Sequence, residues 1–214
     1  MRSNSPAHTA RGSHGFTLIE LTVVLAVIVT LALILTPAIT NFINDARTSR
    51  TRNDVQTIAS AVTQFYKDTG FFPQWSASNN GGAGLAANKV DLLVSPGNVP
   101  ASAQQTLWIT GKSDTLTNQL LSNTPGYAIR TVTNQFGWNG PYLSSDFGAD
   151  AWGNRYMVNV GLLDATIGQQ TSAGAAKSAV WVISAGSNGT IETTYAQPAL
   201  TVVTGGDDIP FRIQ

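Results

Sequence analysis

The sequence predicts an α+β fold in which one long N-terminal helix packs on a small antiparallel β-sheet. The first half of the chain holds a charge-free run, Leu21 to Asn44, followed by helical amphipathic spacing that stops before Gly70. From Tyr127 onward the chain is instead enriched in Val, Ile and aromatic residues between Gly, Asn and Asp, which is typical of strands. Strands that follow one long helix indicate a sheet laid against that helix.

Residues 1–15 are polar, rich in Ser, His and Arg, and lack a hydrophobic pattern. Two interpretations are compatible with this composition: a disordered cytoplasmic tail, or a leader that is removed from the mature chain.

Residues 16–40 are predicted to form a transmembrane helix. The charge-free run contains about 24 residues, which span roughly 36 Å as a helix, against a hydrocarbon core of about 30 Å. The alternatives are a buried core helix and a secretory signal peptide. A buried helix is rarely so long and apolar on every face, and here the small residue precedes the apolar run instead of following it.

Glu20 lies at the edge of this apolar run. An ionisable residue there is costly and predicts a functional partner. If the chain is cut after Gly15, Phe16 gains a positively charged α-amine, and the amine of a neighbouring subunit could neutralise Glu20. The alternative is that Glu20 lies among lipid headgroups and needs no partner.

The hexapeptide at residues 15–20, Gly-Phe-Thr-Leu-Ile-Glu, resembles the prepilin peptidase site of type IV pilins and type II secretion pseudopilins. The resemblance implies cleavage between Gly15 and Phe16, N-methylation of Phe16 and a role for Glu20 in assembly. It also implies a single-pass inner-membrane protein with a cytoplasmic N-terminus and a periplasmic globular domain. Residues 16–40 would then also form the core of a filament.

Residues 41–70 are predicted to continue the same helix as its amphipathic half. An apolar stripe follows the spacing i, i+3, i+4, i+7: Val55, Ile58, Ala59, Val62, Phe65 and Tyr66. Gly70 predicts the C-terminal cap, and Pro37 predicts a local kink, because proline removes a backbone hydrogen bond.

Three arginines, Arg47, Arg50 and Arg52, follow the apolar run. They are interpreted as a solvated or headgroup-facing cluster, with pairing to acids such as Asp45 of a neighbouring subunit as the alternative. Since they flank the run on its C-terminal side, the positive-inside rule does not decide the orientation.

Residues 71–135 are predicted as a loop-rich insertion with short helices around Val90–Val94 and Thr115–Leu121, and residues 136–214 as the β-sheet and C-terminal loop region. The candidate strands extend slightly into the insertion: Tyr127–Thr133, Tyr156–Val160, Ala179–Ser184, Leu200–Val203 and Ile209–Ile213.

Three later stretches resemble the type II secretion major pseudopilin: residues 66–73, 138–154 and 182–189. Within the second stretch, the run Asp-Ala-Trp-Gly-Asn predicts a turn in which Asp150 caps backbone N–H groups and Trp152 packs inward. Ala151 stands where the family has Pro, and residues 74–135 are much longer than the family's loop.

Residues Asp207 and Asp208 place two adjacent carboxylates on a glycine-containing turn. Calcium binds six to eight oxygen ligands, and by resemblance Asp207, Asp208, Ser187 and Asn188 are the metal ligands for Ca²⁺, with Glu192 as a further candidate. The alternative is a solvated turn without metal.

The composition argues against an enzyme. The chain has no cysteine, and both histidines lie in residues 1–15, so the mature chain lacks the commonest general base and the usual transition-metal ligands. The formal net charge is zero, which gives no basic field for nucleic acid.

The resemblance implies a pseudopilin of a type II secretion-type periplasmic filament that drives protein export by assembly. Its partners would be copies of itself in a helical filament, prepilin peptidase, the assembly platform protein and ATPase, minor pseudopilins and the membrane, with no direct nucleic-acid partner. One alternative is a type IV pilus pilin, major or minor, for adhesion or DNA uptake. The other is a membrane-anchored carboxylate enzyme or glycan-binding domain built on the long insertion, with Trp75 and Trp108 as sugar platforms.

Overall fold

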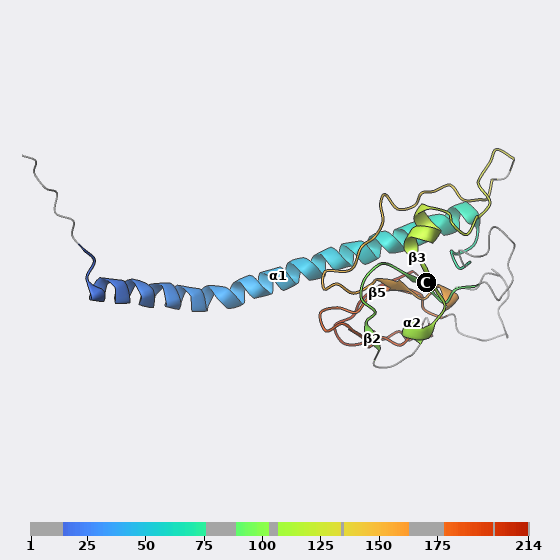
Figure 1. Ribbon diagram of the computed structural model, residues 1–214. Coiled ribbons are helices and arrows are strands. Elements are labelled where there is room, and N and C mark those ends of the chain that lie inside the picture. Colours follow the sequence, from blue (N-terminus) through green and yellow to red (C-terminus); the bar gives the residue numbers. More distant parts are fainter. Residues whose placement is uncertain are drawn as a thin grey trace, which may run out of the picture. The chain divides into compact units, whose positions relative to one another are not determined.

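The computed structural model describes residues 15–75, 89–102, 107–133, 135–162, 178–198 and 200–213. The chain divides into two compact units, residues 1–44 and 45–214. Helix α1 (Leu18–Thr69) begins in the first unit and ends in the second (Figure 1). This confirms the predicted single helix, while the proposed leader lies outside the described residues except for Gly15.

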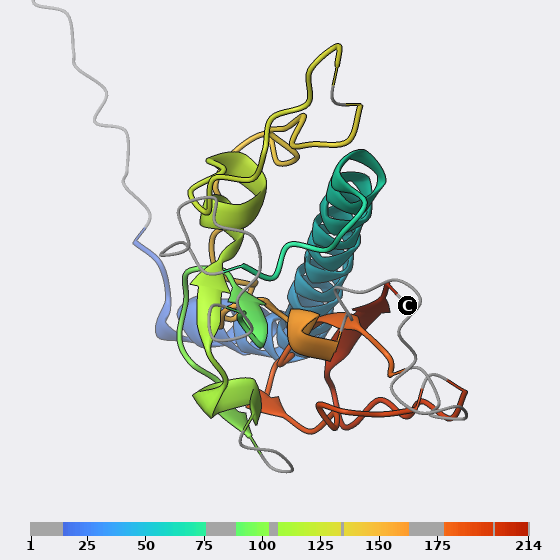
Figure 2. The same ribbon diagram turned by 90° about the vertical axis from the view of Figure 1, so that its right-hand side faces the viewer.

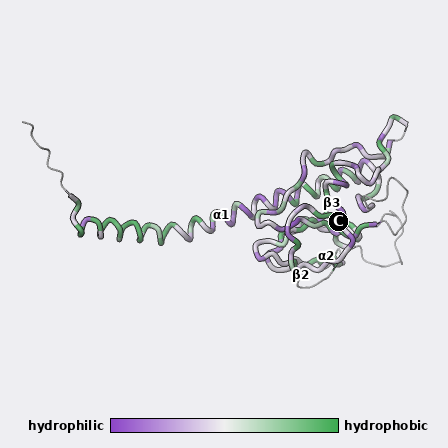
Figure 3. The backbone as a smooth tube through the Cα atoms, in the orientation of Figure 1, coloured by the Kyte–Doolittle hydropathy of each residue, from purple (hydrophilic) through white to green (hydrophobic). Residues whose placement is uncertain are grey.

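In the first unit, α1 exposes apolar side chains on every face, and Figure 3 shows this half of the helix as mainly hydrophobic. Among the described residues, this is the helix long and apolar enough to cross a membrane. Four threonines on it donate their hydroxyls to carbonyls of the preceding turn: Thr22, Thr30, Thr36 and Thr40. These bonds suit a bilayer, where a polar group needs an internal partner. The helix runs through Pro37 without interruption.

In the second unit, the other half of α1 buries the predicted apolar stripe. Val55, Ile58, Val62 and Phe65 are nearly or completely inaccessible to solvent. The helix ends at Thr69, and the N–H of Gly70 bonds to the carbonyl of Tyr66 at 2.8 Å with a φ of +79°. Glycine adopts this left-handed conformation without the steric cost of a Cβ, so the predicted cap is confirmed.

The main sheet has five strands in the order β3-β1-β4-β5-β7. The strands are β1 (Leu92–Val94), β3 (Ser113–Thr115), β4 (Met157–Val158), β5 (Trp181–Ser184) and β7 (Ile209–Arg212). Strands β1, β4, β5 and β7 pair antiparallel, whereas β3 pairs parallel to β1. A separate parallel pair joins β2 (Ala101–Ser102) to β6 (Thr190–Ile191). The predicted α+β arrangement is therefore correct, with a mainly antiparallel sheet.

The central strands β1, β4 and β5 are buried on both faces of the sheet. Because side chains alternate along a strand, Leu93, Val158 and Val182 share one face and join the apolar stripe of α1 in one cluster. Figure 2 shows this half of α1 beside the strands. The opposite face packs against α2 (Leu107–Thr110) and the segment after β6, through residues that include Leu92, Met157, Ile183, Trp108 and Tyr195.

Three local predictions were wrong. Residues 90–94 contain β1 instead of a helix, because they pair between β3 and β4. Tyr127–Thr133 makes one isolated bridge, Ile129 to Trp138, and Val132 is 98% exposed. Leu200–Val203 forms no strand, because the side chain of Gln197 bonds both the N–H and the carbonyl of Val203, as a neighbouring strand would. The predicted helix at 115–121 is present as η3 (Thr117–Leu121), and η4 (Val160–Leu162) follows β4.

Candidate functional site

The proposed cleavage point is open to solvent. Gly15 and Phe16 precede the first turn of α1, both are exposed, and Phe16 is 90% accessible. A Cβ placed on Gly15 would meet no atom within 4 Å. A peptidase therefore meets no steric obstacle from the described part of this chain at the Gly15–Phe16 bond.

Glu20 has a partner within its own chain. Its Oε2 accepts hydrogen bonds from the backbone N–H and the hydroxyl of Thr17, both at 2.8 Å, and the N–H of Glu20 donates to the Thr17 hydroxyl at 3.3 Å. Reciprocal bonds of this kind form a capping box, which satisfies backbone N–H groups at a helix N-terminus. Among the described residues no hydrogen bond reaches Oε1 of Glu20, so one carboxylate oxygen remains for another partner.

The capping box is readable in the sequence as Thr-x-x-Glu ahead of an apolar run, although neither interpretation given above for Glu20, an amine of a neighbouring subunit or the lipid headgroups, includes a partner within its own chain. The structure places the carboxylate at the N-terminus of its own helix, where the helix dipole also favours a negative charge.

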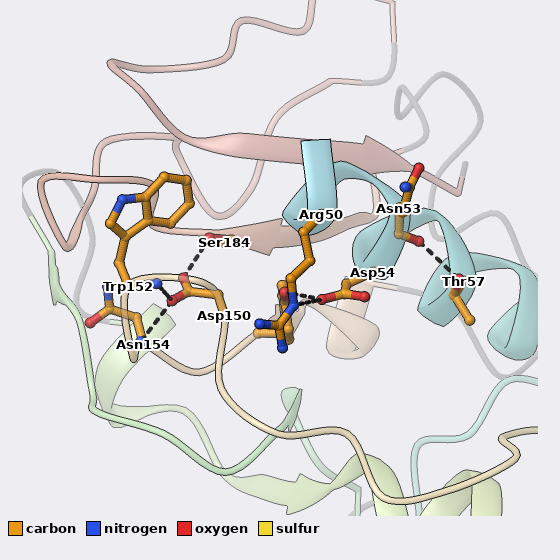
Figure 4. A network of polar contacts seen from close by, with 9 residues as sticks. Arg50, Asn53, Asp54, Thr57, Asp150, Trp152, Asn154 and Ser184 are labelled. Carbon is orange, nitrogen blue, oxygen red and sulfur yellow. Dashed lines mark hydrogen bonds and ion pairs between the residues drawn. The ribbon is translucent and has the colours of Figure 1, made fainter. Parts of the chain in front are cut away.

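The turn after Asp150 has the predicted geometry. Oδ1 of Asp150 accepts the N–H groups of Trp152 at 2.9 Å and Asn154 at 2.8 Å. Its other oxygen, Oδ2, accepts the hydroxyl of Ser184 at 2.6 Å, from the end of β5 (Figure 4). Trp152 is half-buried and packs against the core cluster. The turn is thus tied directly to the strand that leads into residues 185–189.

Asp207 lies against residues 187 and 188, and its carboxylate accepts hydrogen bonds from both of them. Its Oδ2 receives the N–H and hydroxyl of Ser187, both at 2.6 Å, and the N–H of Asn188 at 3.0 Å. The side-chain oxygen of Asn188 accepts the N–H of Thr190 at 2.7 Å. These bonds hold the two loops together.

Asp208 lies in a different environment and is only 9% exposed. Its Oδ2 accepts the N–H groups of Glu192 at 3.0 Å and Thr193 at 2.6 Å, whereas its Oδ1 is buried without a hydrogen bond. Oε2 of Glu192 is likewise buried and without a hydrogen-bond partner. Burial raises the pKa of Asp208, and the nearby charge of Glu192 raises it further, against the effect of the hydrogen bonds it accepts.

Glu192 also lies directly against the turn that carries Asp207 and Asp208. A Cβ on Gly206 would fall 1.5 Å from Oε2 of Glu192, and the φ of Gly206 is +47°. Only glycine leaves room for this carboxylate and adopts this backbone conformation without strain.

Two buried carboxylate oxygens of like charge without hydrogen bonds fit a hard cation, since buried charges require a counter-charge or a metal. Of the candidate ligands, Asp208 and Glu192 carry such oxygens, and Oδ2 of Asp207 accepts hydrogen bonds from Ser187. Among the described residues, no group of three or more acidic, His or Cys side chains gathers at one place.

The two tryptophans named as sugar platforms have other roles. Trp108 is fully buried, and its ring N–H donates to the carbonyl of Thr193 at 2.8 Å. Trp75 is half-buried against the core, with the Lys89 ammonium 5.6 Å from its ring centroid. Trp108 therefore presents no ring face to a sugar.

The comparisons with known proteins agree with the N-terminal geometry. The family description "Prokaryotic N-terminal methylation motif" matches residues 10–36. No curated protein and no solved structure matches the chain. The match covers the cleavage point, Glu20 and the start of the apolar helix, and the fold behind it is the α+β arrangement of one long helix on a mainly antiparallel sheet. The chain therefore carries a prepilin-type N-terminal methylation motif at residues 10–36, ahead of a pilin-like α+β architecture.

Proposed function

We propose that this chain is a pseudopilin, a structural subunit of a type II secretion-type periplasmic filament whose assembly drives protein export. The observation that carries the proposal is the arrangement at the N-terminus. An exposed Gly15–Phe16 bond precedes a helix that is apolar on every face, and Glu20 stands at the start of that helix with one oxygen unused within the described chain.

The steps follow from these groups. Prepilin peptidase cuts after Gly15 and the new N-terminal Phe16 is methylated, while α1 anchors the subunit in the inner membrane with its globular part in the periplasm. The amine of Phe16 in an incoming or neighbouring subunit is positively charged and pairs with the free oxygen of Glu20, since opposite charges attract strongly in an apolar environment. Helix-to-helix packing then buries the apolar faces, and the platform protein and ATPase add further subunits, with minor pseudopilins as additional filament partners.

Calcium is part of this proposal. Asp208 and Glu192 would hold Ca²⁺ through their unpaired buried oxygens, while the bonds from Ser187 and Asn188 to Asp207 close the adjoining loop. The ion would neutralise two like charges and join the turn at 205–208 to the segment after β6. In a chain without cysteine, this would supply the cross-link that a disulfide gives other secreted domains.

A type IV pilus pilin remains the second candidate, because the N-terminal motif is common to both kinds of filament. The turn at Asp150 and residues 182–189 favour the pseudopilin, since both stretches resemble the type II secretion family.

The deciding experiment deletes the gene in its host and restores it with the wild-type chain or with Glu20→Ala. We expect cells that carry the deletion to accumulate the exported proteins in the periplasm and to form the same surface fibres as wild-type cells. The Glu20→Ala chain should be inserted and cleaved normally but fail to assemble or restore export. Loss of surface fibres with normal export would instead establish the pilus pilin, and normal assembly of Glu20→Ala would exclude the docking role.

A further inference from the structure

A cluster of three arginines on α1 follows the apolar run and forms no part of the sites described above. Arg47, Arg50 and Arg52 are all exposed. At about 100° per residue, Arg50 lies about 60° from Arg47 around the helix and Arg52 about 140° from it in the opposite sense. The three guanidinium groups therefore fan around the helix and do not form a single stripe.

Little of this positive charge is neutralised within the chain. The Nε of Arg50 lies 3.7 Å from Oδ2 of Asp54, and its side chain is still 66% exposed. Asp54 also accepts the hydroxyl of Tyr156 at 2.8 Å and is thereby held to the sheet. Figure 4 shows the contact of Asp54 with Arg50. In the ranges that the structure describes, Arg47 and Arg52 have no ion-pair partner.

The spacing along the sequence places these arginines near a membrane surface. The apolar stretch from Leu21 to Ile39 spans about 28 Å as a helix, which matches a hydrocarbon core of about 30 Å. Asn41 and Asn44 follow as the first strongly polar side chains, and Arg47 comes about 12 Å beyond Ile39 along the helix axis. Side chains on a helix lean toward its N-terminus, so the long arginine side chain reaches back toward the headgroup layer.

We propose that Arg47, Arg50 and Arg52 bind the phosphates of anionic phospholipids where α1 leaves the membrane. The proposal rests on the membrane anchoring in the proposed function. A guanidinium group donates paired hydrogen bonds to phosphate oxygens, and a fan of three such groups suits a helix surrounded by headgroups. Arg47 is the nearest to the headgroups and makes the main contact, while Arg50 and Arg52 act from farther out and with stronger screening by salt. This contact would set the depth of α1 before the subunit leaves the bilayer.

The test uses the full chain in detergent with equal amounts of phosphatidylglycerol and phosphatidylcholine, and counts the retained lipids by native mass spectrometry. We expect the wild-type chain to retain phosphatidylglycerol preferentially, with roughly a fivefold loss of preference for each arginine that contacts the surface. The variant Arg47→Gln should lose most among the single variants, and the triple variant with Arg50→Gln and Arg52→Gln should show no preference. The control is Lys67→Gln, which removes one exposed positive charge from the last turn of the same helix and should keep the wild-type preference.

The outcomes separate this proposal from the anchoring on which it rests. Flotation of the chain with phosphatidylcholine vesicles in a density gradient measures the anchoring. A chain that does not float would overturn both the membrane anchoring and the lipid contact. A chain that floats but retains both lipids equally, or a triple variant that keeps the wild-type preference, would overturn the lipid contact alone. If the triple variant keeps its lipid preference but no longer assembles, the arginines serve contacts between subunits, which also overturns the proposal.

Discussion

The carboxylate of Asp150 accepts the hydroxyl of Ser184 at 2.6 Å and so joins the turn at 150–154 to the end of β5. The same hydroxyl accepts the N–H of Gly186 at 3.2 Å, so one chain of hydrogen bonds runs from the turn into the loop that contacts Asp207. Both Asp150 and Ser184 are buried. Because low dielectric strengthens such a network and makes each lost partner costly, this contact couples the turn at 150–154 to the loop at 185–189.

Replacing Asp150 with alanine should reduce the free energy of unfolding by about 2–4 kcal/mol, since it leaves a buried hydroxyl and two backbone N–H groups without an acceptor. Chemical denaturation of the full chain in detergent measures the change. The matched control is Asp146→Ala, which removes an exposed carboxylate nearby and should change stability by less than about 1 kcal/mol. If the two substitutions reduce the free energy of unfolding equally, the Asp150–Ser184 contact contributes no more to stability than an exposed carboxylate does.

Calcium should stabilise the chain through Asp208 and Glu192. A ligand that binds only the folded state raises stability by about 2.7 kcal/mol at one hundred times its dissociation constant, so the melting temperature should rise in calcium and fall in a chelator. Asp208→Asn and Glu192→Gln should each abolish that difference.

Asp207→Asn provides the contrast for the calcium measurement. It weakens the contact with Ser187 and Asn188 and should lower the melting temperature both in calcium and in chelator, with a calcium-induced difference still present. Loss of the difference in Asp207→Asn alone, with Asp208→Asn behaving as wild type, would place the metal at Asp207 and exclude Asp208 as a ligand.

The capping box predicts that the start of α1 depends on Thr17. Thr17→Val removes the hydroxyl bonds at the first turn and should cost about 0.5–2 kcal/mol of helix stability, which speeds amide exchange at the first turn. Thr17→Ser keeps a hydroxyl and should exchange at nearly the wild-type rate. Unchanged exchange in Thr17→Val would mean that Glu20 is held by something other than Thr17.

The stability of the fold should also depend strongly on the side chain of Asn159. Fully buried, it donates to the carbonyls of Tyr195 at 2.8 Å and Ala179 at 3.2 Å and accepts the N–H of Trp181 at 2.7 Å. Asn159→Ala should cost about 3–5 kcal/mol, because it leaves three buried groups unsatisfied and opens a cavity. Asn53→Ala, on the exposed face of α1, serves as the control in the same denaturation series and should be nearly neutral.

Much of the N-terminal half could be predicted because its signals are local. The apolar run, the helical spacing of Val55 to Phe65 and the cap at Gly70 depend on residues within a few turns of one another, and a helix satisfies its backbone from within that range. The Asp150 turn was predictable for the same reason, since Asp150 bonds the N–H groups of residues two and four positions later.

The sheet was less predictable, because strands are completed by segments far away in the sequence. Residues 92–94 have no alternation to reveal a strand, since the sheet is covered on both faces and every side chain of β1 is buried. Conversely, Leu200–Val203 has strand-like composition but forms no strand. The side chain of Gln197 bonds the N–H and the carbonyl of Val203, where a neighbouring strand would otherwise do so.

By itself, the sequence determined the cleavage motif, the membrane-length helix, its amphipathic continuation and the α+β class. Tertiary structure alone decided which acids carry unpaired oxygens. Asp207 and Asp208 are adjacent in sequence, yet their carboxylates lie in different surroundings, one against Ser187 and Asn188 and the other buried beside Glu192. Hydrogen-bond satisfaction depends on every group that the fold brings within about 3 Å, and a linear pattern does not contain that information.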